Sequence, residues 1–87
     1  MYGLTNQIRR AATSIPTNIA EGCGRDGDAE LKRFVSISMG SASEVKYQLL
    51  LAHDLRFLDD SSYEELNARI IEIKRMLASF IKALKSS

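Results

Sequence analysis

The sequence has one thiol and one imidazole, Cys23 and His53, and nucleophilic catalysis is the chemistry that such a pair could perform. The histidine would have to lie within hydrogen-bond distance of the sulfur to take its proton. Cys23 falls in a glycine-rich turn, whereas His53 falls near the far end of the second of three expected helices. At about 1.5 Å per residue, that helix separates the two side chains by roughly 35–40 Å. We therefore predict no catalytic residues, and expect His53 at an edge or interface and Cys23 as a small buried side chain.

A glycine motif in the same turn formally matches the dinucleotide-binding fingerprint. It reads Gly22-x-Gly24-x-x-Gly27. That fingerprint binds a pyrophosphate where it follows a β-strand and opens a helix beside a parallel sheet. Here a helix precedes the motif, and no strand is predicted. We interpret the glycines as a helix stop and a turn, and we expect no cofactor.

Acidic residues alternate at positions 26, 28 and 30 in the manner of a calcium-binding loop. Such a loop requires glycine at its sixth position and a bidentate glutamate at its twelfth. Leu31 and Ile37 stand at those positions. One histidine and one cysteine are also too few for a zinc site within one chain. The sequence therefore predicts no metal site, and Asp28 is the expected N-cap of the second helix.

Basic residues are the remaining candidates for a chemical role, as contacts to phosphate. They gather near the first turn and along the last helix, whereas acidic residues gather near the second turn. The candidate nucleic-acid-binding residues are Arg9, Arg10, Arg25, Lys32, Arg33, Lys74, Arg75, Lys82 and Lys85. No aromatic residues are interleaved for base stacking, so binding would follow shape and backbone. The same pattern is also typical of a solvated face with ordinary surface ion pairs, and both interpretations stay open.

The elements that must position these residues are three helices in one domain, residues 1–87. A chain of 87 residues with 45% hydrophobic residues and a net charge of +1 is a single globular domain, and one that is marginally stable alone. Glycine- and aspartate-rich turns separate segments whose apolar residues recur every three or four positions. The expected helices span approximately residues 3–22, with a kink at Pro16, then 28–56 and 61–85. Short connections predict an all-α, antiparallel up-and-down bundle.

The second helix lacks a proper polar face. One side carries a heptad-like apolar seam, at Leu31, Val35, Ser38, Ala42, Val45, Leu49 and Ala52. The opposite side is small or apolar, and a helix of that kind is normally buried all round. We expect an oligomer interface there, formed by Ser36, Met39, Gly40, Ser43, Tyr47, Leu50 and Leu51. The alternative is that the kinked first helix covers this face.

Residues 2–22, which begin with Tyr-Gly-Leu-Thr, resemble the proteins encoded in 23S rRNA intervening sequences, and so does the segment 34–51. The similarity covers essentially the whole chain. Position by position, Arg9 and Arg10 match the paired arginines of the family motif, and Pro16 matches its mid-helix proline. Relatives of the family include the accessory variability determinants of diversity-generating retroelements, which assist a reverse transcriptase and bind nucleic acid.

The resemblance implies a small bacterial protein of the four-helix-bundle type that forms homo-oligomers, typically pentamers. Members usually carry another helix before the motif with which this sequence begins. We therefore expect an oligomeric bundle of the four-helix family that lacks the first family helix, or one in which the kink at Pro16 leaves four helical segments. The resemblance also implies no enzymatic activity and a role in binding rRNA or other nucleic acid.

From these observations we expect a noncatalytic, oligomeric helical protein that binds structured RNA through basic surfaces. The alternative is a protein–protein adaptor, for example accessory to a polymerase or reverse transcriptase, without direct nucleic-acid binding. The sequence shows no signal peptide and no apolar run long enough for a bilayer, so we expect a cytoplasmic protein with no membrane partner.

Overall fold

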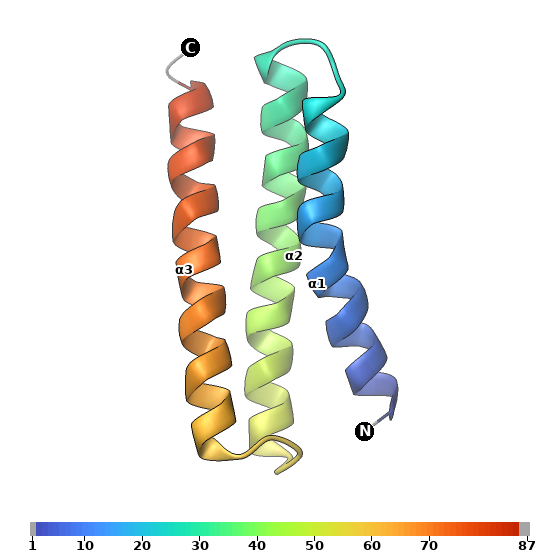
Figure 1. Ribbon diagram of the computed structural model, residues 1–87, viewed down its shortest axis with the longest axis vertical. Coiled ribbons are helices and arrows are strands. Elements are labelled where there is room, and N and C mark those ends of the chain that lie inside the picture. Colours follow the sequence, from blue (N-terminus) through green and yellow to red (C-terminus); the bar gives the residue numbers. More distant parts are fainter. Residues whose placement is uncertain (1, 86–87) are drawn as a thin grey trace.

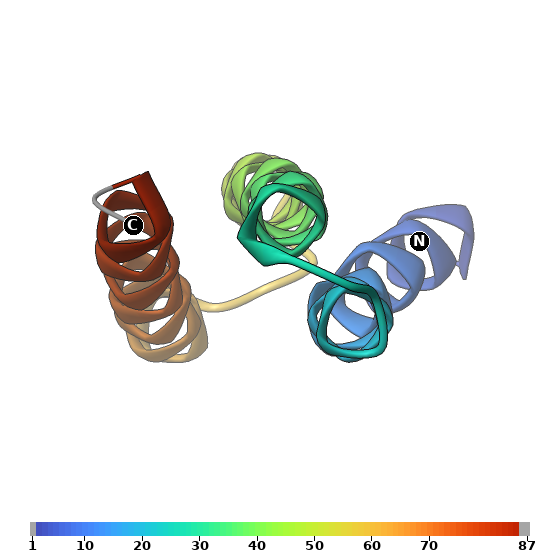
Figure 2. The same cartoon turned by 90° about the horizontal axis from the view of Figure 1, so that it is seen from above.

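The computed structural model describes the backbone of residues 2–85 and the side chains of residues 2–84. This part of the chain folds into three helices, α1 (Tyr2–Cys23), α2 (Asp28–Asp54) and α3 (Asp60–Lys85), and contains no strand. The helices run up, down and up in a body measuring 44 × 22 × 13 Å (Figure 1). Viewed along the helices, α2 lies between α1 and α3 (Figure 2). None of the described helices is apolar over the length that crossing a bilayer requires.

The expected fold class, an oligomeric bundle of the four-helix type, is wrong because the described chain forms three helices. One expectation was that a break at Pro16 would divide the first helix and so give a fourth helical segment. The proline instead lies inside a continuous α1, because its missing N–H removes a single hydrogen bond while the flanking turns keep theirs. It bends the helix, so that the N-terminal half of α1 leans away from α2 (Figures 1 and 2).

Small residues let α1 and α2 pack closely. Gly22 is buried, and a Cβ atom built on it would lie 2.9 Å from the Cβ of Phe34. Ser14 and Ser41 share a hydrogen bond of 2.8 Å between their hydroxyl oxygens. The expected seam of α2 is confirmed at every position from Val35 onward, since Val35, Ser38, Ala42, Val45, Leu49 and Ala52 are all buried.

The helix α3 is covered on a narrower strip than its apolar spacing predicts. Ile70 and Leu77 are buried against α2, with 4% and 5% exposure. Three other apolar residues of α3 at the same three- and four-residue spacing, Leu66, Ile73 and Phe80, are 39%, 37% and 36% exposed. The reason is geometric: the backbones of α1 and α3 do not approach each other in the described chain, so α3 has α2 as its single packing partner.

The helix ends depart from the expected caps. Gly27 precedes α2 with φ 88° and no side-chain cap, so Asp28 is the first helical residue rather than the N-cap. The Asp59 carboxylate accepts a 2.7 Å hydrogen bond from the Ser62 N–H and caps α3. The helix α2 ends before the expected Arg56, because Arg56 adopts a left-handed conformation with φ 64°.

Candidate nucleic-acid interface

One end of the bundle gathers the C-terminus of α1, the N-terminus of α2 and the C-terminus of α3 (Figure 1). Arg25, Lys32 and Arg33 lie at the α1–α2 corner of this end, and Lys82 lies near the end of α3. We call these four residues the basic end. The side chain of Lys85, also predicted to bind phosphate, lies outside the described residues. The antiparallel fold thus brings cations from distant parts of the sequence to one end of the molecule.

Phe34 positions two of these guanidinium groups. The Cζ atom of Arg33 lies 4.5 Å from the centroid of the Phe34 ring, and that of Arg25 lies 5.4 Å from it. The ring itself is buried, with 8% exposure. A cation over an aromatic face is attracted by the ring quadrupole. A rigid core residue therefore holds two positive charges at the surface.

Each of these arginines also has a carboxylate neighbour. Arg33 Nε donates a 2.9 Å hydrogen bond to Glu30, and Arg25 lies 3.7 Å from Glu21. The hydrogen bond from Arg33, followed by the charge of the same guanidinium, lowers the pKa of Glu30 below its ordinary value. Exposed pairs of this kind contribute little to stability. A phosphate could therefore replace these carboxylates as the partner of the arginines with little loss of folding stability.

The other predicted phosphate-binding residues lie elsewhere. Arg9 and Arg10 are exposed in the first half of α1, on the part that leans away from α2. Lys74 and Arg75 lie near the middle of α3, where Arg75 donates a 3.1 Å hydrogen bond to Glu72. The nine predicted residues therefore do not form one patch, because the fold separates them into an end cluster and two groups on different helices.

The predicted oligomer interface forms the outer face of α2. Five of its seven residues are exposed, and Met39 and Leu51 are half-buried. Tyr47 and Leu50 are 64% and 43% exposed, which shows that the bent α1 does not cover this face. The exposed members are Ser36, Gly40, Ser43, Tyr47 and Leu50.

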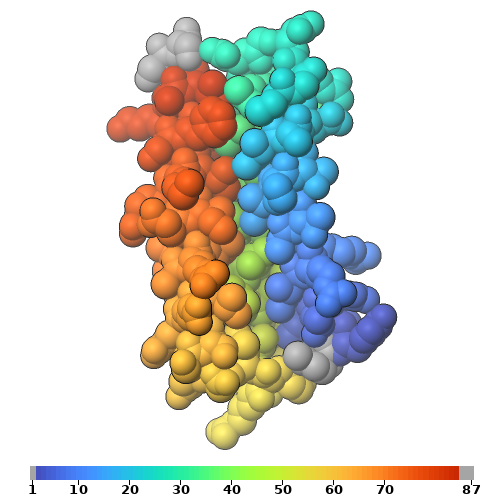
Figure 3. Space-filling view, viewed as in Figure 1, coloured from blue at the N-terminus to red at the C-terminus, as the bar shows by residue number. Residues whose placement is uncertain are grey.

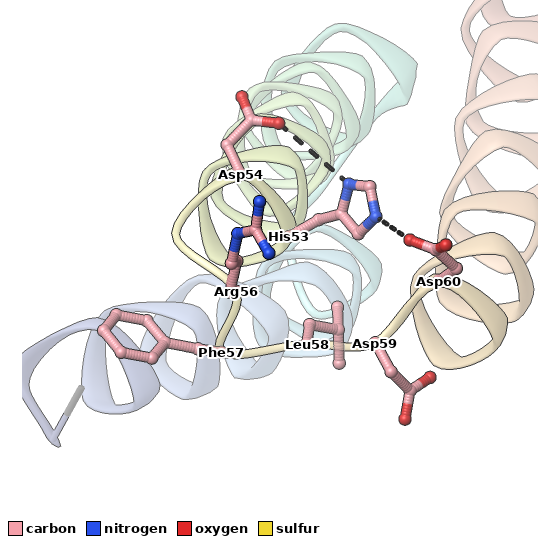
Figure 4. A pocket seen from close by; sticks show the side chains of 7 residues that line it. All are labelled: His53, Asp54, Arg56, Phe57, Leu58, Asp59 and Asp60. Atoms are coloured by element: carbon pink, nitrogen blue, oxygen red, sulfur yellow. Dashed lines mark hydrogen bonds and ion pairs between the residues drawn. The ribbon is translucent and has the colours of Figure 1, made fainter.

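The opposite end of the molecule contains the histidine. The Nε2–H of His53 donates a 2.6 Å hydrogen bond to Asp60 (Figure 4). The imidazole also stacks on Tyr63, with 4.4 Å between the ring centroids. Asp54 lies 4.0 Å from the other ring nitrogen. These contacts join the last turn of α2 to the first turns of α3. The expectation of an edge position for His53 is confirmed.

The imidazole of His53 and the thiol of Cys23 lie at opposite ends of the bundle. An open hollow of about 800 Å³ lies beside His53, but no described hydrogen bond joins the imidazole to a hydroxyl or thiol. Cys23 lies at the other end of the bundle, as the helix length predicts. The expectation that Cys23 is buried is wrong: it is exposed, because it ends α1 at the corner beyond the packed turns.

Sequence reasoning missed the role of Phe34. The available signal was an aromatic residue directly after Arg33 at the start of an amphipathic helix. Its contact with Arg25 had no such signal, because that contact depends on how the corner folds.

Similarity to known proteins is found for the fold and for the sequence. No protein of curated function matches the chain significantly. A crystal structure of a protein of unknown function from the S23 ribosomal protein family of Bacteroides thetaiotaomicron is 32% identical, with a TM-score of 0.87. The match covers 91% of this chain and 73% of the Bacteroides chain. The chain also matches the family described as 23S rRNA-intervening sequence protein over residues 1–79, and it belongs to that family.

Proposed function

We propose that this chain is a noncatalytic protein that binds structured RNA by contacting phosphates with its basic end. The observation that carries the proposal is the pair of guanidinium groups held over Phe34, next to Lys32. Cations fixed on a rigid support lose less conformational freedom on binding than free surface side chains. The N-terminus of α2, at the same end, adds a positive helix dipole.

Binding of this kind follows the shape and charge of the RNA more than its bases. Phosphate contacts position a protein on a nucleic acid but carry no direct sequence information. Each neutralised phosphate releases counterions, so affinity should fall steeply with salt. The family description supports RNA as the nucleic acid, since it names a 23S rRNA intervening sequence.

The test is fluorescence anisotropy with a labelled RNA hairpin at several salt concentrations. Replacing Arg25, Lys32 and Arg33 together by glutamine should weaken binding and make the dependence of log K on log salt shallower by about one unit per lost contact. The matched control replaces Lys46, Arg56 and Arg69 by glutamine, which removes the same charge outside the basic end. An equal loss in both variants, or no binding at low salt, would contradict the proposal.

Self-association through the outer face of α2 would bring several copies of the basic end into one assembly. Symmetric copies raise the number of phosphates that one assembly contacts, and the electrostatic field grows accordingly. Exposure of Tyr47 and Leu50 supports this face as the contact surface. A charge at Tyr47, as in Tyr47→Glu, should then lower both the assembly mass and the RNA affinity.

The same exposed face favours a second function, that of an adaptor for another protein. An apolar helix face without a described covering can dock the apolar face of a partner helix. A relation to accessory proteins of diversity-generating retroelements would make a reverse transcriptase the partner. Binding of purified reverse transcriptase after nuclease treatment, and its loss in Tyr47→Glu, would select this function over RNA binding.

A further inference from the structure

A small polar pocket, which we call the α1–α2 pocket, lies between the first two helices. Its volume is about 240 Å³. The residues that line it are Gln7, Arg10, Ala11 and Ser14 from α1 and Ser41 and Glu44 from α2. Pockets that enclose a whole small-molecule ligand usually measure about 300–1,000 Å³. A pocket of this size and polarity therefore suits one unit of a longer polar chain better than a free small molecule.

The α1–α2 pocket lies on the same side of the helix pair as Arg33 of the basic end. Ile8 lines a hollow together with residues of α3, on the face of the molecule that Figure 3 shows. Arg10 follows Ile8 by two positions and so lies on the opposite side of α1. On α2, Glu44 and Arg33 are about three helical turns apart and share one face, roughly 17 Å from each other along the axis. At about 3.4 Å per stacked nucleotide, one strand of about five nucleotides spans this distance.

Two hydrogen-bond donors of the pocket are available to a ligand. The hydroxyls of Ser14 and Ser41 share one hydrogen bond of 2.8 Å, which uses one of their two protons. Asn18 Nδ2 donates a 2.9 Å hydrogen bond to Ser14 Oγ and holds this hydroxyl in place. Arg10 is exposed and has no ion-pair partner among residues 2–84, in contrast to the arginines at the basic end. The pocket therefore offers a guanidinium and a hydroxyl proton.

Glu44 supplies an acceptor in the same pocket. Its Oε2 atom accepts a 3.3 Å hydrogen bond from the amide of Gln48, and Gln48 is 5% exposed. A buried side chain thus positions the carboxylate, whose other oxygen accepts no hydrogen bond from the described chain. An ionised carboxylate can only accept hydrogen bonds, and it repels other anions. A suitable ligand must present a hydrogen-bond donor to Glu44 next to an anion for Arg10.

We propose that the α1–α2 pocket binds one ribose–phosphate unit of RNA, with the phosphate on Arg10 and the 2′-hydroxyl on Glu44. This inference rests on the proposed function and adds to it the discrimination of RNA from DNA. A ribonucleotide carries an anion and a 2′-hydroxyl donor in one backbone unit, and DNA lacks that hydroxyl. Guanidinium groups bind phosphate through charge-assisted hydrogen bonds, and an acidic side chain can accept the hydrogen bond of a ribose hydroxyl. DNA would leave the carboxylate of Glu44 beside phosphates without a donor, which disfavours its binding.

The first test uses the native chain and three labelled hairpins of one sequence, made of RNA, 2′-O-methyl RNA and DNA. The 2′-O-methyl hairpin keeps the A-form shape of RNA but has no 2′-hydroxyl proton to donate. Fluorescence anisotropy should show RNA bound about ten- to a hundredfold more tightly than the other two, the usual value of a hydrogen bond to a charged group. Equal affinity for RNA and 2′-O-methyl RNA would overturn the inference, because shape alone would then be recognised.

The second test removes the carboxylate. In Glu44→Ala the affinities for RNA and 2′-O-methyl RNA should become equal within about twofold, since the acceptor of the 2′-hydroxyl is gone. The matched control is Glu64→Ala, which removes the same charge from an exposed position on α3 and should leave the ratio of the two affinities unchanged. Glu44 is exposed as well, and circular dichroism checks that both variants stay helical. An unchanged ratio in Glu44→Ala would contradict the assignment of this residue.

The third test concerns the phosphate contact. Arg10→Gln should weaken binding of all three hairpins and make the dependence of log K on log salt shallower by about one unit. Arg9→Gln removes the same charge from the neighbouring position, which does not line the pocket, and should change the slope less. Equal effects of the two variants would overturn the role of Arg10.

The outcomes also separate this inference from the proposed function. A native chain that binds no RNA at low salt overturns both. Weakened RNA binding after the joint replacement of Arg25, Lys32 and Arg33, together with no preference for RNA over 2′-O-methyl RNA in the native chain, overturns the ribose–phosphate site alone.

Discussion

The hydroxyl of Ser38 donates a 2.8 Å hydrogen bond to the backbone carbonyl of Ile15. Ser38 is fully buried on α2, and Ile15 directly precedes the proline that bends α1. A small polar side chain thus meets the backbone of the neighbouring helix at the bend. The contact stabilises the α1–α2 interface at the bend, and a larger residue would not fit there because Ser38 is fully buried.

Ser38→Ala should therefore destabilise the protein by about 1 kcal/mol, the typical net value of one hydrogen bond. Ser38→Val should cost more, because the added methyl groups overpack a site without free space. Urea denaturation followed by circular dichroism measures both. Ser36→Ala is the control on the same helix, and its exposed position predicts a change within about 0.5 kcal/mol.

Two helical glycines should respond to alanine with opposite signs. In Gly22→Ala the new Cβ lies 2.9 Å from Phe34 and 3.1 Å from Leu31, so the helices must separate, at a cost of about 1–3 kcal/mol. In Gly40→Ala nothing lies within 4 Å, and the higher helix propensity of alanine should add about 0.5–1 kcal/mol of stability. Thermal denaturation of dilute samples compares the two. A similar melting temperature for both would contradict the close packing of α1 and α2.

Arg56→Gly should stabilise the chain by about 1 kcal/mol, because the left-handed conformation is unfavourable for residues with a Cβ atom. The N–H groups of Arg56 and Phe57 bond the carbonyls of His53 and Ala52, so the position after the end of α2 is one at which glycine is preferred. Arg56→Ala removes the same charge but keeps the Cβ. If the alanine variant gained as much stability as the glycine variant, backbone strain would not be the cause.

Asp59 should make α3 sensitive to acid. The hydrogen bond from the Ser62 N–H, the largest of several causes, lowers the pKa of the Asp59 carboxyl below its ordinary value of 3.8. Because the folded-state pKa lies below the unfolded one, the stabilisation is full above pH 3.8 and is lost as the pH falls through the folded-state pKa.

Asp59→Asn supplies the measurement for this effect. Asparagine caps a helix about as well as aspartate but does not titrate in this range. Its melting temperature should therefore fall less between pH 5 and pH 2.5 than that of the native chain, by the contribution of this one carboxyl. Asp59→Ala should melt lower at neutral pH, since it has no cap. Parallel pH profiles for the native and Asp59→Asn chains would show that the cap does not titrate.

The predictions from sequence are confirmed where the geometry of a single helix decides which way a residue faces or how far apart two residues lie. The seam of α2 is confirmed from Val35 to Ala52, since a helix packed between two others buries whatever its spacing places inward. The separation of Cys23 from His53 follows from the rise of one helix and is confirmed as well. The predicted cap of α2 failed, because Gly27 occupies the N-cap position and Asp28 already lies within the helix.

The residues of the candidate interface could be proposed from the sequence, but their arrangement in space could not. The basic residues could be named from the sequence, whereas their division into an end cluster and two separate groups depends on how the turns fold. The support that Phe34 gives to Arg25 and Arg33 needs the turn between α1 and α2 to bring Arg25 back over the ring. A helical wheel describes one helix and contains no information on that turn.

The sequence by itself determined the all-helical class, the period of the helices, the bend at Pro16 and membership of a family, because these properties depend on neighbouring residues and on local order along the chain. The tertiary structure decided which apolar residues are covered. Leu66 and Ile73 have the same spacing as the buried Ile70 and Leu77, yet they remain exposed because the described backbones of α1 and α3 do not approach each other. Burial depends on which other segments of the fold pack against a helix, and the periodicity of that helix contains no information about them.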